Sequence, residues 1–186
     1  MLARLNHTRL LRYAGLFTWG AVGLWLLSVW FDPTILSPDT EGPPALQILR
    51  WLVVYLAFGL IYWWISRQLG RPSGALDKVL LLVLTGCAIG VGYFSRTGLG
   101  SILLMVVAGL LPWLMPVRWG LALLVGGNVA IIPLFVEALD FPPMVAVLQS
   151  VTYMGFSSLV FVTALVARQQ AEAREEQRRL NAELRA

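Results

Sequence analysis

Six long apolar runs, separated by short stretches of charged residues, glycine and proline, make up most of the chain. They occupy residues 13–31, 46–66, 76–94, 99–115, 118–136 and 144–167. Each run is long enough to cross the hydrocarbon core of a bilayer, which is roughly 30 Å thick, as an α-helix. Lipid offers the backbone no hydrogen-bond partner, and no run shows the alternation of a barrel strand. The pattern therefore predicts an all-α polytopic membrane protein with a bundle of six transmembrane helices.

The composition excludes a water-soluble globular fold. Hydrophobic residues make up 58% of the chain and charged residues 13%, whereas soluble domains average roughly 25% charged residues. Six spans leave no room for a soluble catalytic domain. The formal net charge is +4, but the basic residues are scattered between the apolar runs and form no basic face. We therefore expect no nucleic-acid partner.

The basic residues fall on one side of the predicted bundle if the spans alternate in direction. That side holds Arg4, Arg9, Arg12, Arg67, Arg71, Lys78, Arg118, Arg168, Arg174, Arg178, Arg179 and Arg185. The other side holds Arg50 and Arg96 beside the carboxylates Asp32, Asp39, Glu41, Glu137 and Asp140. The positive-inside rule then predicts a multi-pass protein of the inner (plasma) membrane with both termini in the cytoplasm, residues 1–12 being a basic N-terminal segment.

Nothing in the chain predicts catalysis. Chemistry inside a membrane would need a nucleophile with a base, a carboxylate pair or a metal cluster. No Asp or Glu lies deep in a span, and the only His and Cys are His7 and Cys87. We expect no catalytic residue, no metal and no cofactor in this chain.

Five polar residues inside the predicted spans are candidates for a sensory site: Arg50, Asn128, Gln149, Ser150 and Thr152. Asn128 and Gln149 could form hydrogen bonds across neighbouring helices, an interaction worth about 0.6 kcal/mol and up to roughly 2 kcal/mol. A purely structural role and a sensory role both stay open for these residues. Arg50 could extend towards the outer water layer, or pair with a carboxylate or a lipid phosphate.

Small and helix-breaking residues indicate how the spans pack. Small residues recur at every fourth position in the third and fifth spans, which lets helix backbones approach closely. We expect these positions to pack within one subunit, with dimerisation as the alternative. Pro112, Pro116 and Pro133 should end or kink helices, with Pro116 turning the chain between the fourth and fifth spans. The small residues are Gly86, Gly90, Ala122, Gly126 and Ala130.

The last span is expected to continue into the cytoplasm as one rod. Residues 144–186 contain no proline and one glycine, Gly155, so a helix of about 64 Å is expected. Beyond the membrane, residues spaced alternately four and three apart follow the a/d pattern of a coiled coil. This pattern predicts that residues 168–186 form a cytoplasmic coiled-coil stalk in a homodimer, although a single solvated helix stays open. The seam consists of Val166, Gln170, Ala173, Gln177, Leu180 and Leu184.

The run RQQAEAREEQRRLNAELRA at 168–186 resembles the linker between the last membrane helix and the dimerisation helices of DesK-like sensor histidine kinases. In that family, a multi-span sensor without a large external domain controls autophosphorylation of a downstream His. The resemblance implies a kinase domain that binds ATP and Mg, and a cytoplasmic response regulator as partner. The phosphoacceptor His and the ATP-binding domain do not occur before Ala186, so no catalytic residue carries over. The resemblance implies a sensor module separated from its kinase.

The favoured function is therefore a membrane signal-input module of a two-component histidine kinase. Lipid thickness, temperature, a small hydrophobic molecule and a partner membrane protein all fit as the stimulus. The sensor domain of a diguanylate cyclase is an alternative with the same architecture. A small transporter or channel is a second alternative, which would need ionisable residues along a central path and an internal repeat, neither of which is found. A scaffold for another membrane protein is a third.

Overall fold

The computed structural model describes residues 7–31, 44–70 and 74–185, and these residues form α-helices and no β-strand. The prediction of an all-α chain is confirmed. Several residues used above to predict orientation lie outside the described residues: Arg4, Asp32, Asp39, Glu41 and Arg71. The helices are α1 (His7–Phe31), α2 (Pro44–Gln68), α3 (Ala75–Ser95), α4 (Leu99–Leu114), α5 (Val117–Val129), α6 (Ile132–Glu137) and α7 (Pro143–Glu183).

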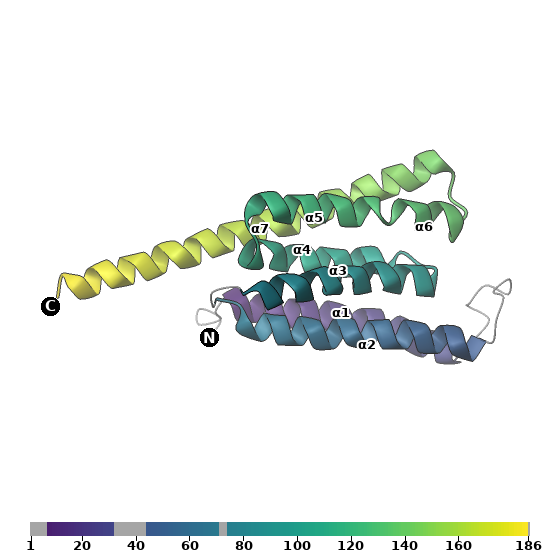
Figure 1. Cartoon of the computed structure of the whole chain (residues 1–186), viewed down its shortest axis with the longest axis horizontal. Helices are drawn as coiled ribbons and strands as arrows, with labels where there is room; N and C mark the ends of the chain where they lie inside the picture. Colours follow the sequence, from purple (N-terminus) through teal and green to yellow (C-terminus); the bar gives the residue numbers. More distant parts are fainter. Residues whose placement is uncertain (1–6, 32–43, 71–73, 186) are drawn as a thin grey trace.

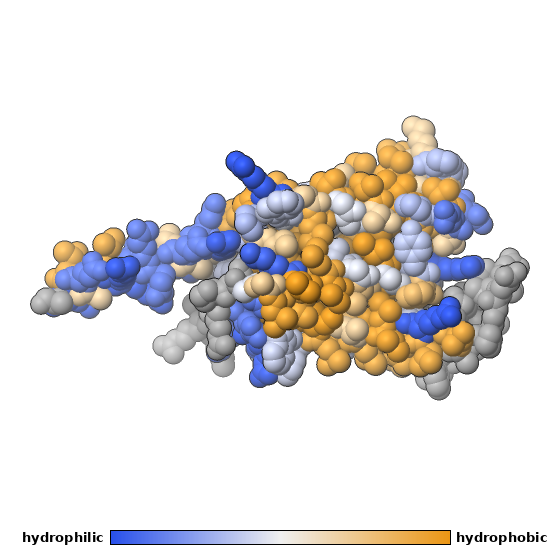
Figure 2. All heavy atoms as spheres, in the orientation of Figure 1, coloured by the Kyte–Doolittle hydropathy of each residue, from blue (hydrophilic) through white to orange (hydrophobic). Residues whose placement is uncertain are grey.

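Four stretches of helix are long and apolar enough to cross a membrane: Ile48–Gln68 in α2, α3, Val117–Glu137 across α5 and α6, and α7. These lengths and compositions are those of a membrane protein. α4 is apolar but has only 16 residues. Figure 2 shows that hydrophobic side chains predominate on the visible face of the bundle, whereas hydrophilic ones gather towards its two ends and on the projecting part of α7.

The helices form a bundle with α1 and α2 on one side, α3 and α4 in the middle, and α5, α6 and α7 on the other side (Figure 1). α4 is the central element, since it packs against α1, α3, α5 and α7. Most of its residues are buried. The chain runs back and forth, so that the start of α1 and the projecting part of α7 lie at the same end of the bundle (Figure 1).

The apolar run at 118–136 forms two helices instead of one. α5 ends at Val129 and α6 begins at Ile132. Pro133 has no N–H to donate to the carbonyl of Val129, so the helical hydrogen bonding is interrupted where the sequence predicted. Both helices continue in the same direction (Figure 1).

α1 is attached to α2 by aromatic side chains that reach its backbone. The Tyr62 hydroxyl donates to the Leu11 carbonyl at 2.8 Å, and the Tyr55 hydroxyl donates to the Trp19 carbonyl at 2.8 Å. Trp19 Nε1 donates in return to the Tyr55 carbonyl at 3.0 Å, and the two rings stack with centroids 4.9 Å apart. The pair therefore combines two hydrogen bonds with an aromatic contact.

The predicted packing of small residues within one subunit is wrong for most of the positions. Gly86, Ala122, Gly126 and Ala130 are exposed on the surface of the bundle, and a Cβ placed at Gly86 or Gly126 would meet nothing within 4 Å. Only Gly90 is partly covered, by Val54. Spacing marks one face of a helix, but it does not decide whether a neighbouring helix or lipid lies against that face.

The close approaches occur at other glycines. A Cβ added at Gly15 would lie 2.0 Å from the Tyr62 hydroxyl, and one added at Gly23 would lie 2.2 Å from the Tyr55 hydroxyl. The hydroxyls can reach the α1 backbone only because these two positions lack a side chain.

Gly15→Ala should therefore destabilise the protein by about 1–3 kcal/mol, because the buried Tyr62 must move. Gly20→Ala is the matched control on the same helix, since a Cβ at Gly20 meets nothing within 4 Å. The free energy of unfolding in mixed micelles, followed by tryptophan fluorescence, measures both. Equal stability of the two variants would contradict the tyrosine contact.

Candidate functional site

The five candidate polar residues do not form one cluster. Asn128 and Ser150 are buried, Gln149 is half-buried, and Thr152 and Arg50 are exposed. The Thr152 hydroxyl donates to the Leu148 carbonyl of its own helix at 2.9 Å. Among the described residues, Arg50 forms no ion pair with the two carboxylates at its end of the bundle, Glu137 and Asp140.

Asn128 and Ser150 meet where α5 is interrupted. The Ser150 hydroxyl on α7 donates to the backbone carbonyl of Asn128 at 2.7 Å. The Asn128 side chain turns back to its own helix, where Nδ2 donates to the Leu124 carbonyl at 2.8 Å. A hydrogen bond therefore joins these helices, but it is not one made by the Asn128 or Gln149 side chain: it joins the Ser150 hydroxyl to the backbone of Asn128.

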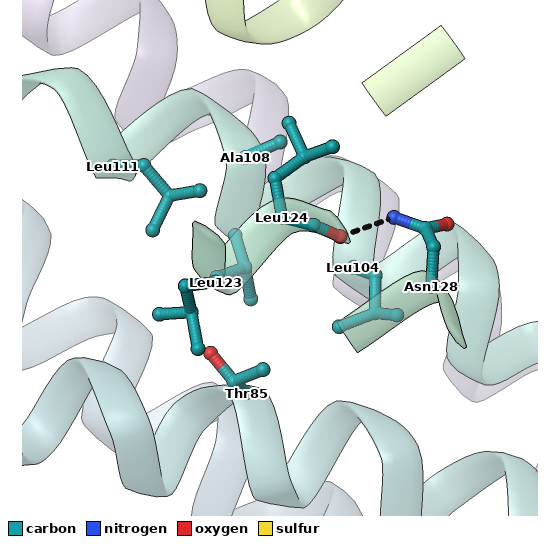
Figure 3. A pocket seen from close by; sticks show the side chains of 8 residues that line it. Thr85, Leu104, Ala108, Leu111, Leu123, Leu124 and Asn128 are labelled. Carbon is teal, nitrogen blue, oxygen red and sulfur yellow. Dashed lines mark hydrogen bonds between the residues drawn. The ribbon is translucent and has the colours of Figure 1, made fainter. Parts of the chain in front are cut away.

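A small cavity lies beside Asn128, between α3, α4 and α5 (Figure 3). Its volume of about 10 Å³ is close to the minimum that a single water needs. Apart from Thr85 and Asn128 its lining is aliphatic, and the Thr85 hydroxyl donates to the Leu81 carbonyl at 2.9 Å. The cavity is therefore too small, and its polar groups too engaged, to bind an organic ligand.

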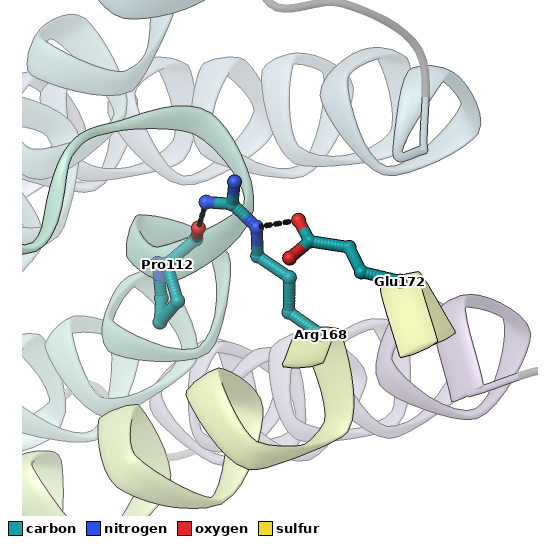
Figure 4. Close-up of polar contacts among 3 residues, drawn as sticks. All are labelled: Pro112, Arg168 and Glu172. Carbon is teal, nitrogen blue, oxygen red and sulfur yellow. Dashed lines mark hydrogen bonds and ion pairs between the residues drawn. The ribbon is translucent and has the colours of Figure 1, made fainter. Parts of the chain in front are cut away.

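A second contact fastens α7 at the opposite end of the bundle. The Arg168 guanidinium donates through Nη1 to the Pro112 carbonyl in the last turn of α4, and through Nε to Glu172 Oε1 at 2.7 Å (Figure 4). The Arg168 side chain is 36% exposed and Glu172 61%. This three-residue group, Arg168 with Pro112 and Glu172, is called the Arg168 contact below.

α7 continues beyond this contact without a break. Residues 169–185, called the C-terminal extension below, are exposed except for the half-buried Ala171. Ion pairs within the helix join Arg178 to Glu175 at 3.9 Å and Arg179 to Glu183 at 3.1 Å. The predicted seam residues all lie on α7 or its last turn, and all six are exposed: Val166, Gln170, Ala173, Gln177, Leu180 and Leu184.

The described part of the chain holds no group of three or more His, Cys, Asp or Glu side chains that could bind a metal ion. What the arrangement offers is mechanical: a long helix held to the bundle at two points. Ser150 and Arg168 are 18 positions apart, which corresponds to about 27 Å along the helix axis. This spacing is close to the hydrocarbon thickness of a bilayer, roughly 30 Å.

Sequence reasoning identified Ser150 and Asn128 but not the role of Arg168. A signal for it is present in the sequence, because Pro116 follows Pro112 by four residues. A helix carbonyl accepts its hydrogen bond from the N–H four residues later, and proline has none. The free carbonyl is thus visible in the sequence, whereas the residue that reaches it is not.

Comparison with protein-family models, with curated proteins and with solved structures finds no match for this chain. The resemblance of residues 168–186 to DesK-like kinases therefore stays a prediction from the sequence.

Ser150→Ala removes the hydrogen bond between α7 and α5 and should lower the free energy of unfolding by about 0.6 kcal/mol and at most roughly 2 kcal/mol. Thr152→Ala is the control on the same helix, because its hydroxyl binds only its own helix. Chemical unfolding in mixed micelles compares the two. A larger loss for Thr152→Ala would refute the assigned role of Ser150.

Proposed function

We propose that this chain is a membrane-embedded sensor module that transmits a stimulus from the bilayer, or from close to it, through α7 to a dimeric cytoplasmic effector. The observation that carries the proposal is α7 itself. It is one helix of 41 residues, Pro143–Glu183, about 62 Å long. Its first part packs against α4, α5 and α6, and its last part is exposed. Any movement of the first part is therefore passed on to the last.

The proposed membrane topology has six spans and both termini in the cytoplasm. Four stretches meet the criteria of length and hydropathy, and α1 beyond Arg12 and the buried α4 supply the other two. The helix directions in Figure 1 support the orientation. The ends of α1, α2, α3 and α5 that carry Arg12, Arg67, Lys78 and Arg118 lie together, at the end of the bundle from which α7 projects. The positive-inside rule assigns such an end to the cytoplasm.

A homodimer is proposed because the C-terminal extension has apolar side chains without a partner. Leu180 is 52% exposed and Leu184 85% exposed, although they would lie in water in this topology. Both fall on the predicted a/d seam, and a second copy of the same helix would cover them. The proposed effector is a histidine kinase with ATP and Mg in its own catalytic domain and a response regulator as its partner.

Insertion of alanines between Ala173 and Arg174, in a fusion of the chain to the dimerisation and catalytic domains of a histidine kinase, tests the proposal. Each alanine rotates the downstream helix by about 100°. Autophosphorylation should change with one, two or three alanines. With seven alanines, which add about two full turns, autophosphorylation should return to the level of the fusion without an insertion. Equal activity across the series would contradict transmission through α7, and solute flux through liposomes that hold the chain would instead favour a transporter.

Cysteine cross-linking tests the dimer in a Cys87→Ser background. Ala173→Cys lies on the seam and should form disulfide-linked dimers in membranes. Ala182→Cys, an exposed alanine on the opposite face of the same extension, should form several-fold fewer, since facing a and d positions approach closely in a coiled coil. Non-reducing gel electrophoresis measures both. Equal cross-linking would exclude the predicted seam.

A further inference from the structure

The last turn of α4 ends in a way that leaves a buried carbonyl without a helical donor. Met115 has an extended backbone, with φ −131° and ψ 154°, and its N–H donates to the Leu111 carbonyl at 3.0 Å. The next helical donor would come from Pro116, which has no N–H. The Pro112 carbonyl therefore depends on a donor from elsewhere, and Pro112 is itself buried.

Arg168 is that donor, and it comes from the helix that leads out of the bundle. Its planar guanidinium presents N–H groups in fixed directions. One of these donates to Pro112 and another to Glu172, which lies one turn further along α7 (Figure 4). Glu172 therefore fixes the orientation of the guanidinium, and the Pro112 carbonyl fixes its position against α4. The pair with Glu172 moves with α7, whereas the bond to Pro112 forms only when α7 presents Arg168 to the end of α4.

The Arg168 contact also marks the place where α7 leaves the bundle. Ala164 is the last buried residue of α7, and every residue from Gln169 to Arg185 is exposed or, at Ala171, half-buried. A rotation by one residue, about 100°, or a slide by one residue, about 1.5 Å, would misplace the guanidinium. Apart from the Arg168 contact and the Ser150 hydroxyl, which donates to Asn128, the surface that α7 packs against the described part of the bundle makes no other hydrogen bond to it.

The geometry points to Arg168 as a releasable contact that sets the rotation of the C-terminal extension relative to α4. This inference rests on the proposed function, because it names the residue that regulates the transmission through α7. With the Arg168 contact formed, the extension is held at one angle. When it is broken, α7 is held only by Ser150 and apolar packing, and the extension can adopt a second angle. Arg168 is thus a positioning residue.

Distance measurement between spin labels tests this inference on residues 1–186 in lipid nanodiscs. In a Cys87→Ser background, labels at Val117→Cys and Glu176→Cys report the separation between the start of α5 and the C-terminal extension, both positions being exposed. Dilution of labelled protein into unlabelled protein removes distances between copies. Double electron–electron resonance should give one narrow distribution for the unsubstituted Arg168.

Arg168→Ala should add a second population, displaced by up to about 5 Å, the rise of one helical turn. Arg168→Lys keeps a donor for the Pro112 carbonyl and should largely preserve the narrow distribution. Arg179→Ala is the matched control, because Arg179 forms the same type of pair with Glu183 on the exposed extension. An unchanged distribution in a monodisperse Arg168→Ala sample overturns the inference.

The kinase fusion separates this inference from the proposed function. Arg168→Ala should change basal autophosphorylation at least severalfold, whereas Arg179→Ala should not. If the distances are unchanged while the alanine insertions still alter activity with helical phase, the Arg168 inference fails and the proposed function stands. If the distances change but neither Arg168→Ala nor the insertions alter autophosphorylation, the proposed function is wrong. The regulatory role of Arg168 is then wrong as well.

Discussion

Helices in lipid must satisfy their backbone hydrogen bonds inside the protein, and this requirement decides how α7 is held. Prolines interrupt helical hydrogen bonding at the end of α4 and after α5, and each interruption leaves carbonyl oxygens without the usual donor. Lipid cannot replace that donor. Arg168 supplies a donor from α7 to the Pro112 carbonyl, which Pro116 leaves free. Ser150 donates from α7 to the Asn128 carbonyl in the last turn of α5, one residue before the Val129 carbonyl that Pro133 leaves free. Both directed bonds that join α7 to the bundle therefore lie at the ends of other helices.

α4 connects the parts of the structure that these bonds act on. It packs against α1 and α3 on one side and against α5 and α7 on the other. α1 is tied to α2 by Tyr55, Tyr62 and Trp19, so α1 to α4 form a well-fastened group. α7 is joined to this group mainly by apolar packing on α4 and by Arg168. α7, the helix that extends out of the bundle, is thus joined to its described neighbours by two directed bonds, those of Ser150 and Arg168.

The sequence was sufficient for the all-α class and for the interruption at Pro133, because both follow from local rules of hydropathy and backbone chemistry. It was insufficient where an outcome depends on which face of a helix meets a neighbour. Gly126 has the spacing of a packing residue but faces outwards. Gly15 follows no such pattern, yet the Tyr62 hydroxyl packs against it. Asn128 was identified as polar and intramembrane, yet its hydrogen bond to α7 uses its carbonyl, which every residue type possesses.

The other acceptors in these contacts are backbone carbonyls too, since Leu11, Trp19 and Pro112 also contribute main-chain oxygen atoms. Such acceptors survive replacement of their side chain, whereas the donors do not. In diverging descendants of this sequence, natural selection would consequently act on the side chains of the two tyrosines, the serine and the arginine, and on Trp19, whose indole is itself a donor. The side chains of Leu11, Asn128 and Pro112 would be free to change.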